Sequence, residues 1–164
     1  MVRERVIAAA ALLAVLCGIT FARAGVYEND ITLFTDVVEK SPDKARPYNN
    51  LGDALKRAGR IDEALRNFEM ALAINPNYPD ALNNLATIYS LHKDLQQAAS
   101  LLRQALELSP RHLQARFNLA ILYYEAGLPD DAEREFRALL EIDPSSKEAA
   151  FARRMLAMKP AAAR

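Results

Sequence analysis

The sequence contains one short motif three times at a constant spacing. The motif occurs as Asn50-Leu51-Gly52, Asn84-Leu85-Ala86 and Asn118-Leu119-Ala120, so consecutive copies begin 34 residues apart. A period of this length is typical of stacked arrays in which every repeat is one helix–turn–helix unit. Each such unit buries its apolar face only against its neighbours. The triplets therefore predict an all-α superhelical solenoid.

Aligning the chain on the triplets gives three units, 45–78, 79–112 and 113–146. The apolar pattern predicts a first helix in each unit at 46–58, 80–92 and 114–126. It predicts a second helix at 62–74, 95–108 and 130–142. Glycine at a turn tolerates a left-handed backbone, acids favour helix starts, and proline ends the units because it cannot extend a helix. The residues in these roles are Gly59 and Gly127, Asp62 and Asp130, and Pro76, Pro110 and Pro144.

Two segments flank the units. Residues 25–44 are expected to form a half-repeat that caps the array, with a helix from Tyr27 to Asp43. Residues 147–158 are expected to form a capping helix that turns Ala150, Phe151 and Met155 inward, because a terminal repeat needs a polar outer face. Residues 159–164 remain as a tail.

The pattern within the units resembles the tetratricopeptide repeat (TPR) family, whose consensus alternates bulky, small and aromatic positions before a final proline. The three units supply these residues in order: Tyr48, Leu51, Gly52, Leu55, Ala64, Phe68, Ala71 and Pro76; Leu82, Leu85, Ala86, Tyr89, Ala98, Leu102, Ala105 and Pro110; Arg116, Leu119, Ala120, Tyr123, Ala132, Phe136, Leu139 and Pro144. Arg116 departs most from the pattern and is expected to weaken the outer seam of the third unit. Gly52, Ala86 and Ala120 are expected to face Ala64, Ala98 and Ala132 where paired helices cross closely.

The composition offers little for catalysis. Lys and Arg number 21, Asp and Glu number 21, and Cys17 is the single cysteine. Charge balance argues against nucleic-acid binding, and one cysteine excludes a disulfide framework. His92 and His112 lie 20 residues apart with no third ligand at a metal spacing, so a capping or solvated role is expected. We expect a non-enzymatic protein without cofactor, metal or small-molecule substrate.

Residues 1–24 form a separate segment. Val6 to Ala22 carries no charge, and 17 helical residues span about 26 Å. This segment fits three readings: an uncleaved membrane anchor, a signal peptide cleaved after Ala24, or the last membrane helix of a longer protein. Arg3 and Arg5 precede the apolar run, so the repeats are expected to face outward. For a bacterium this means an inner-membrane protein with periplasmic repeats, or a periplasmic or secreted protein after cleavage.

Binding is the expected activity. In the TPR family the first helices line a concave groove, and the resemblance places ten residues there: Asn49, Asn50, Asp53, Asn83, Asn84, Thr87, Phe117, Asn118, Ile121 and Tyr124. A side-chain amide both donates and accepts, so a ladder of asparagines can pair with a peptide backbone of any sequence. This resembles the asparagine ladder of the O-linked N-acetylglucosamine transferase repeats. Phe117, Ile121 and Tyr124 would anchor an apolar side chain. The alternative is that Asn50, Asn84 and Asn118 bond only to neighbouring helices.

Two further resemblances bear on partners. The chaperone-binding version of the fold clamps a C-terminal carboxylate with Lys and Arg, but Asn49 stands where that clamp has Lys, which disfavours it. The exit from the apolar segment resembles that of membrane mannosyltransferase-type proteins with outward repeats, through Tyr27, Asn29, Asp30, Leu33, Phe34, Pro42, Arg46 and Tyr48–Gly52. The alternative function is therefore an accessory or C-terminal repeat part of a membrane glycosyltransferase.

Overall fold

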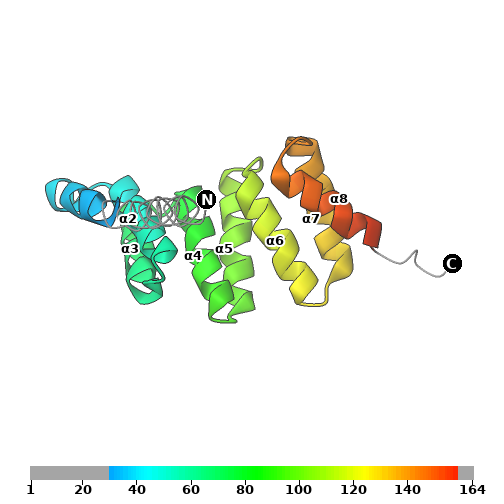
Figure 1. Ribbon diagram of the computed structural model, residues 1–164, viewed down its shortest axis with the longest axis horizontal. Helices are drawn as coiled ribbons and strands as arrows, with labels where there is room; N and C mark the ends of the chain where they lie inside the picture. The colour runs from blue at the N-terminus through cyan, green and yellow to red at the C-terminus, as the bar shows by residue number, and fades with distance from the viewer. Residues whose placement is uncertain (1–29, 159–164) are drawn as a thin grey trace, which may run out of the picture.

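The computed structural model describes residues 30–158, and these residues are almost entirely helical (Figure 1). Residues 30–40 form a helix that ends at Lys40, three residues before the predicted end at Asp43, because the residue before Pro42 is disfavoured in a helix. The predicted start at Tyr27 lies outside the described residues. The following helices are α2 (Ala45–Arg57), α3 (Ile61–Ile74), α4 (Pro79–Leu91), α5 (Leu95–Leu108), α6 (Leu113–Glu125), α7 (Pro129–Ile142) and α8 (Lys147–Met158). The predicted α5 and α8 have the observed bounds, and each first helix begins and ends one residue earlier than predicted.

The helices pack as a row of antiparallel pairs along the long axis of the molecule (Figure 1). Within each repeat the first and second helices contact each other, as α2 with α3, α4 with α5 and α6 with α7. Each second helix also contacts the first helix of the next repeat, and the first helices α2, α4 and α6 contact one another in sequence. The predicted all-α TPR-like solenoid is thus the observed architecture.

The turn inside each repeat uses a left-handed residue at one repeat position. Gly59 and Gly127 have φ of 77° and 73°, and Lys93 occupies the same position with φ 64°. Asp62 and Asp130 were expected to cap α3 and α7, but both lie inside the first turn, where their charge still favours the positive helix end. Among these second helices a side-chain cap forms in α5, where Asp94 accepts from the Gln97 backbone N–H.

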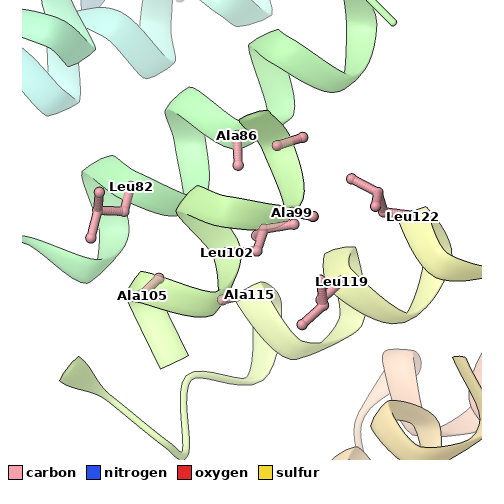
Figure 2. Close-up of a cluster of buried hydrophobic side chains, with 9 residues drawn as sticks. Leu82, Ala86, Ala99, Leu102, Ala105, Ala115, Leu119 and Leu122 are labelled. Atoms are coloured by element: carbon pink, nitrogen blue, oxygen red, sulfur yellow. The ribbon is translucent and has the colours of Figure 1, made fainter. Parts of the chain in front are cut away.

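The core combines small residues at the helix crossings with several large apolar residues in each repeat. Ala64, Ala98 and Ala132 are 0 %, 0 % and 2 % exposed. Gly52 meets Phe68: a Cβ added at Gly52 would lie 2.7 Å from Phe68 Cε1, so the aromatic ring rather than Ala64 sets the limit there. Figure 2 shows the middle cluster, in which Leu82 and Ala86 of α4, Leu102 of α5 and Leu119 of α6 converge.

Arg116 is accommodated by an ion pair in place of an apolar contact. Its guanidinium donates to Glu135 on α7 at 2.6 Å and to the Pro110 carbonyl at 2.7 Å. The side chains of Arg116 and Glu135 are 17 % and 14 % exposed, and Arg116 Nε is buried without a partner. The charged residue therefore links α6 to α7 and to the loop before α6, and its effect on stability stays a prediction.

The capping helix α8 turns the predicted face inward at two of three predicted residues. Ala150 was expected to point inward, but it is exposed, whereas Ala149 and Ala152 are fully buried against α7 and Phe136. Phe151 and Met155 are half-buried in the same cluster, as expected. With 3.6 residues per turn, Ala149, Phe151, Ala152 and Met155 share one side of the helix and Ala150 lies on the other.

The predicted membrane segment 1–24 and the tail 159–164 lie outside the described residues. Within residues 30–158, every helix is too short or too polar to cross a bilayer.

The tight helix crossing predicts the effect of enlarging Ala98. Ala98→Leu inserts three carbons where no space exists, and overpacking of this kind costs about 1–3 kcal/mol of unfolding free energy. We expect a clearly lower melting temperature by circular dichroism. Ala73→Leu, on the exposed side of α3, is the matched control and should change little. Equal melting temperatures for Ala98→Leu and the parent would contradict the crossing.

Candidate functional site

The ten predicted groove residues all lie on the first helices α2, α4 and α6, which lie side by side. We call the surface they occupy the first-helix face. Asn50, Asp53, Asn84, Thr87 and Asn118 are half-buried on it. Asn49 and Asn83, in contrast, are 7 % and 6 % exposed. The structure therefore divides the predicted set into an accessible row and a buried row.

The buried and accessible asparagines are hydrogen-bonded to each other across repeats. Asn84 Nδ2 donates to Asn49 Oδ1 at 3.0 Å, and Asn118 Nδ2 donates to Asn83 Oδ1 at 2.9 Å. Both pairs are separated by 35 residues in the chain, one repeat plus one position. Asn84 and Asn118 thus do bond to neighbouring helices. Asn49 and Asn83 accept these inter-repeat bonds, and their burial leaves little of either side chain accessible to a ligand.

The same amides keep unused hydrogen-bonding capacity. Asn84 Oδ1 accepts from Lys56 Nζ at 3.2 Å, and Asn118 Oδ1 accepts from Gln114 Nε2 at 3.1 Å. A carboxamide carries two N–H donors and two oxygen lone pairs, so each residue retains one donor beyond its inter-repeat bond. Asn50, at the start of the row, has no side-chain hydrogen bond to any described residue. Ligand contact by these three residues stays a prediction.

The α2 end of the face is charged but internally paired. Lys56 Nζ lies 3.0 Å from Asp53 Oδ1 and 5.8 Å from the centroid of the Phe68 ring. Arg57 Nε also pairs with Asp53, at 3.2 Å. In α4 the Thr87 hydroxyl donates to the Asn83 backbone carbonyl at 3.0 Å, which leaves its oxygen able to accept. The face therefore offers small, fixed polar groups rather than an isolated charge.

The predicted apolar anchor is split by the capping helix. Phe117 packs edge-on against Phe151 of α8, with ring centroids 5.5 Å apart, and Ile121 packs against the same cluster. Tyr124 is different because it remains 53 % exposed. Phe117 and Ile121 are thus largely engaged within the protein.

A cavity of about 170 Å³ lies where α6, α7 and α8 meet. We call it the α8 cleft, and it is lined by Tyr124, Pro129, Ala132, Glu133, Phe136, Met155, Leu156 and Met158. Sequence reasoning placed only Tyr124 in a binding site. The three apolar residues that end α8 were the available signal, since a capping helix needs no apolar residues on an outer face.

His112 makes structural contacts, whereas the His92 side chain is exposed at the end of α4. His112 caps α6, as one of its two expected roles, because its Nδ1 accepts from the Ala115 N–H at 3.2 Å. Its Nε2 must then carry the proton and donate to Asp80 Oδ1 at 3.0 Å, which joins α6 to α4. Burial, reinforced by the Asp80 carboxylate, raises the pKa of the neighbouring Tyr78 phenol. In residues 30–158 no three His, Cys, Asp or Glu side chains gather in a way that could hold a metal.

Comparison with known families agrees with this geometry. One tetratricopeptide-repeat model matches residues 89–156, and a second TPR-repeat model matches residues 52–93. Residues 52–156 belong to the tetratricopeptide-repeat family. A curated relative, mouse tetratricopeptide repeat protein 21A, is 41 % identical over 49 residues, which is 30 % of this chain and 4 % of that protein. The TPR chain thus matches a small part of that relative's length.

Solved TPR structures share the fold. A thermophilic TPR protein of Thermus thermophilus superposes with a TM-score of 0.73 at 22 % identity, covering 87 % of this chain and 79 % of that one. MamA gives 0.66 at 18 % identity, covering 81 % and 80 %. The first TPR of Spaghetti (RPAP3), bound to an HSP90 peptide, gives 0.64 at 22 % identity, covering 70 % and 91 %.

The inter-repeat amide bonds predict unequal effects of two alanine substitutions. Asn118→Ala removes the donor to Asn83 Oδ1 and leaves a buried acceptor unpaired, at a cost of about 1–3 kcal/mol. Asn50→Ala removes an amide without a described partner and should cost less than about 0.5 kcal/mol. Urea unfolding followed by circular dichroism measures both. Similar losses for the two variants would show that the amide bonds do not stabilise the stack.

Proposed function

We propose that this TPR protein is a non-enzymatic scaffold whose first-helix face binds an extended segment of a partner protein. One observation carries the proposal: an accessible amide recurs at the same position of all three first helices, as Asn50, Asn84 and Asn118. Amides at regular intervals suit a ligand whose hydrogen-bonding groups also recur at regular intervals, as the N–H and C=O groups of a polypeptide backbone do.

The dimensions of the array support this reading. Packed helices lie about 8–10 Å apart. An extended peptide advances about 3.3 Å per residue, so amides in consecutive repeats would meet every third residue of the ligand. Asn84 and Asn118 are already oriented by their bonds to Asn49 and Asn83. Holding the amides in place beforehand lowers the entropy lost on binding.

The proposed ligand is an internal peptide segment rather than a C-terminal carboxylate. Asn49, at the position where the chaperone-binding version of the fold has Lys, is buried and accepts a bond from Asn84. α2 carries three cations, and each is engaged within the protein: Arg46, one turn before Asn49, bonds to Tyr78, and Lys56 and Arg57 are paired with Asp53. No cation of α2 is therefore held ready for a terminal carboxylate.

Crosslinking tests where the partner binds. Replacing Ser90, half-buried on α4 one turn from Thr87, by photoreactive benzoylphenylalanine in the full chain should give a discrete crosslinked protein in the native host. Ser100, exposed on the second helix α5, is the matched control. Equal crosslinking from Ser90 and Ser100 would contradict binding at the first-helix face.

We also propose that residues 1–24 hold the scaffold in a membrane with the repeats outside the cytoplasm. The uncharged run Val6 to Ala22, preceded by Arg3 and Arg5, supports it. The full chain should remain with membranes after carbonate extraction, and its intact mass should include residues 1–24. A mature chain that begins at Gly25 and is released into the soluble fraction would instead establish a cleaved signal.

A further inference from the structure

The α8 cleft is open to solvent and mostly apolar. Phe136 forms part of its wall and is 2 % exposed, whereas Tyr124 and Met158 are 53 % and 73 % exposed. Met155 and Leu156 complete the apolar lining from α8. Methionine side chains are flexible and polarisable, so they adapt to the shape of an entering group. A volume of about 170 Å³ is of the order of one large side chain.

Among residues 30–158, the cleft lies on a side of α8 on which no further helix packs. Ile88, Leu122 and Leu156 occupy one repeat position, and Ile88 and Leu122 are 0 % and 5 % exposed, whereas Leu156 is half-buried. Ile88 lies between Phe68 of the preceding repeat and Leu101 of its own second helix. Leu156 likewise packs in the cluster that contains Phe136 of the preceding repeat. Because α8 is the last helix of the described residues, no second helix within them covers Leu156 as Leu101 covers Ile88.

The α6–α7 side of the cleft carries more carboxylates than cations. Glu133 lines the cleft, Glu125 follows Tyr124, and Asp130 and Asp131 follow Pro129. Two guanidiniums lie on the same helix, where Arg134 bonds to Asp131 and Arg137 to Glu133, each at 2.6 Å. Carboxylates thus outnumber cations on the segment 125–137. The negative C-terminal end of α6 adds to this potential.

We propose that the α8 cleft binds one bulky apolar side chain, Phe or Leu, of a partner peptide with Arg or Lys on either side. The apolar side chain fills the space beside Phe136 and Met155, and the flanking cations are attracted by the excess of carboxylates on segment 125–137. This site rests on the proposed peptide-binding function, and it lies beyond the asparagine row, adjoining the first-helix face at Tyr124. It gives the partner a hydrophobic anchor in place of Phe117 and Ile121, which α8 has engaged.

Methionine methyl NMR of the full chain tests the site. The chain has four methionines: Met155 and Met158 line the cleft, Met70 is exposed on α3, and Met1 begins the chain. Titration with acetyl-Gly-Arg-Phe-Arg-Gly-amide should shift the ¹³C-methyl signals of Met155 and Met158 saturably, through the ring current of the bound Phe. The Met70 signal should stay in place.

Matched peptides and variants separate the two contributions. Replacing the peptide Phe by Ala, or both Arg by Glu, should weaken binding about tenfold or more. The triple variant Glu125→Gln, Asp130→Asn, Glu133→Gln should reduce affinity and its salt dependence. A control triple with the same charge change elsewhere, Asp62→Asn, Glu69→Gln, Glu107→Gln, should bind like the parent.

Three results would overturn the proposal. The first is equal shifts of Met70, Met155 and Met158, which indicate non-specific contact. The second is peptide binding that appears only after residues 159–164 are removed, which assigns the cleft to the chain's own tail. The third is a shift of Met155 with protein concentration alone, which assigns it to a second copy. Crosslinking at Ser90 is independent of all three, so failure here leaves the first-helix face to be judged separately.

Discussion

The close crossing of two helices inside each repeat is the constraint on which the rest of the structure depends. Ala64, Ala98 and Ala132 are almost completely buried at these crossings, and Gly52 lies against the Phe68 ring with no room for a methyl group. Because the paired helices approach so closely, each pair packs as one unit around large buried residues that include Phe68, Leu102 and Phe136. Only such a unit can present its second helix to the next repeat at a constant angle, and only constant stacking brings the first helices into a continuous face.

The contacts between first helices change character along the array. Two of these contacts are amide pairs, Asn49 with Asn84 and Asn83 with Asn118. One repeat further on, the same two positions are occupied by Phe117 on α6 and Ala152 on α8, which belong to one apolar cluster. A buried amide without a hydrogen-bond partner lowers the free energy of unfolding by about 1–3 kcal/mol. An asparagine at one of the two positions therefore requires an asparagine at the other. Replacing Asn by Phe on α6 is therefore matched by replacing Asn by Ala on α8. The apolar end of the first-helix face is, by this reasoning, an internal junction between the last repeat and its cap.

Regular features were predictable from sequence and individual side-chain partners were not. The period fixed the helices within one residue, because apolar periodicity, the left-handed Gly59 and Gly127 and the closing prolines all agree. The prediction for α8 was right for Phe151 and Met155 and wrong for Ala150, because a sequence pattern does not distinguish neighbouring alanines and only packing against Phe136 selects Ala149 and Ala152. Arg116 was seen as a departure, but its partner Glu135 lies 19 residues away and on another helix. The α8 cleft depends on which faces remain uncovered, which is a property of the assembled array.

The asparagine row was approached from sequence as a choice between ligand contact and stacking, and the geometry makes the two compatible. One N–H of Asn84 holds Asn49 while its second N–H remains, and the same holds for Asn118 with Asn83. An aspartate at either position could not donate a hydrogen bond to the neighbouring repeat, and a leucine could not hydrogen-bond to a ligand. Asparagine supplies both, and the bond to the neighbouring repeat fixes the direction of the remaining donor. An amide ladder that stiffens the array is therefore also one whose free donors are held at a spacing that an extended backbone can meet.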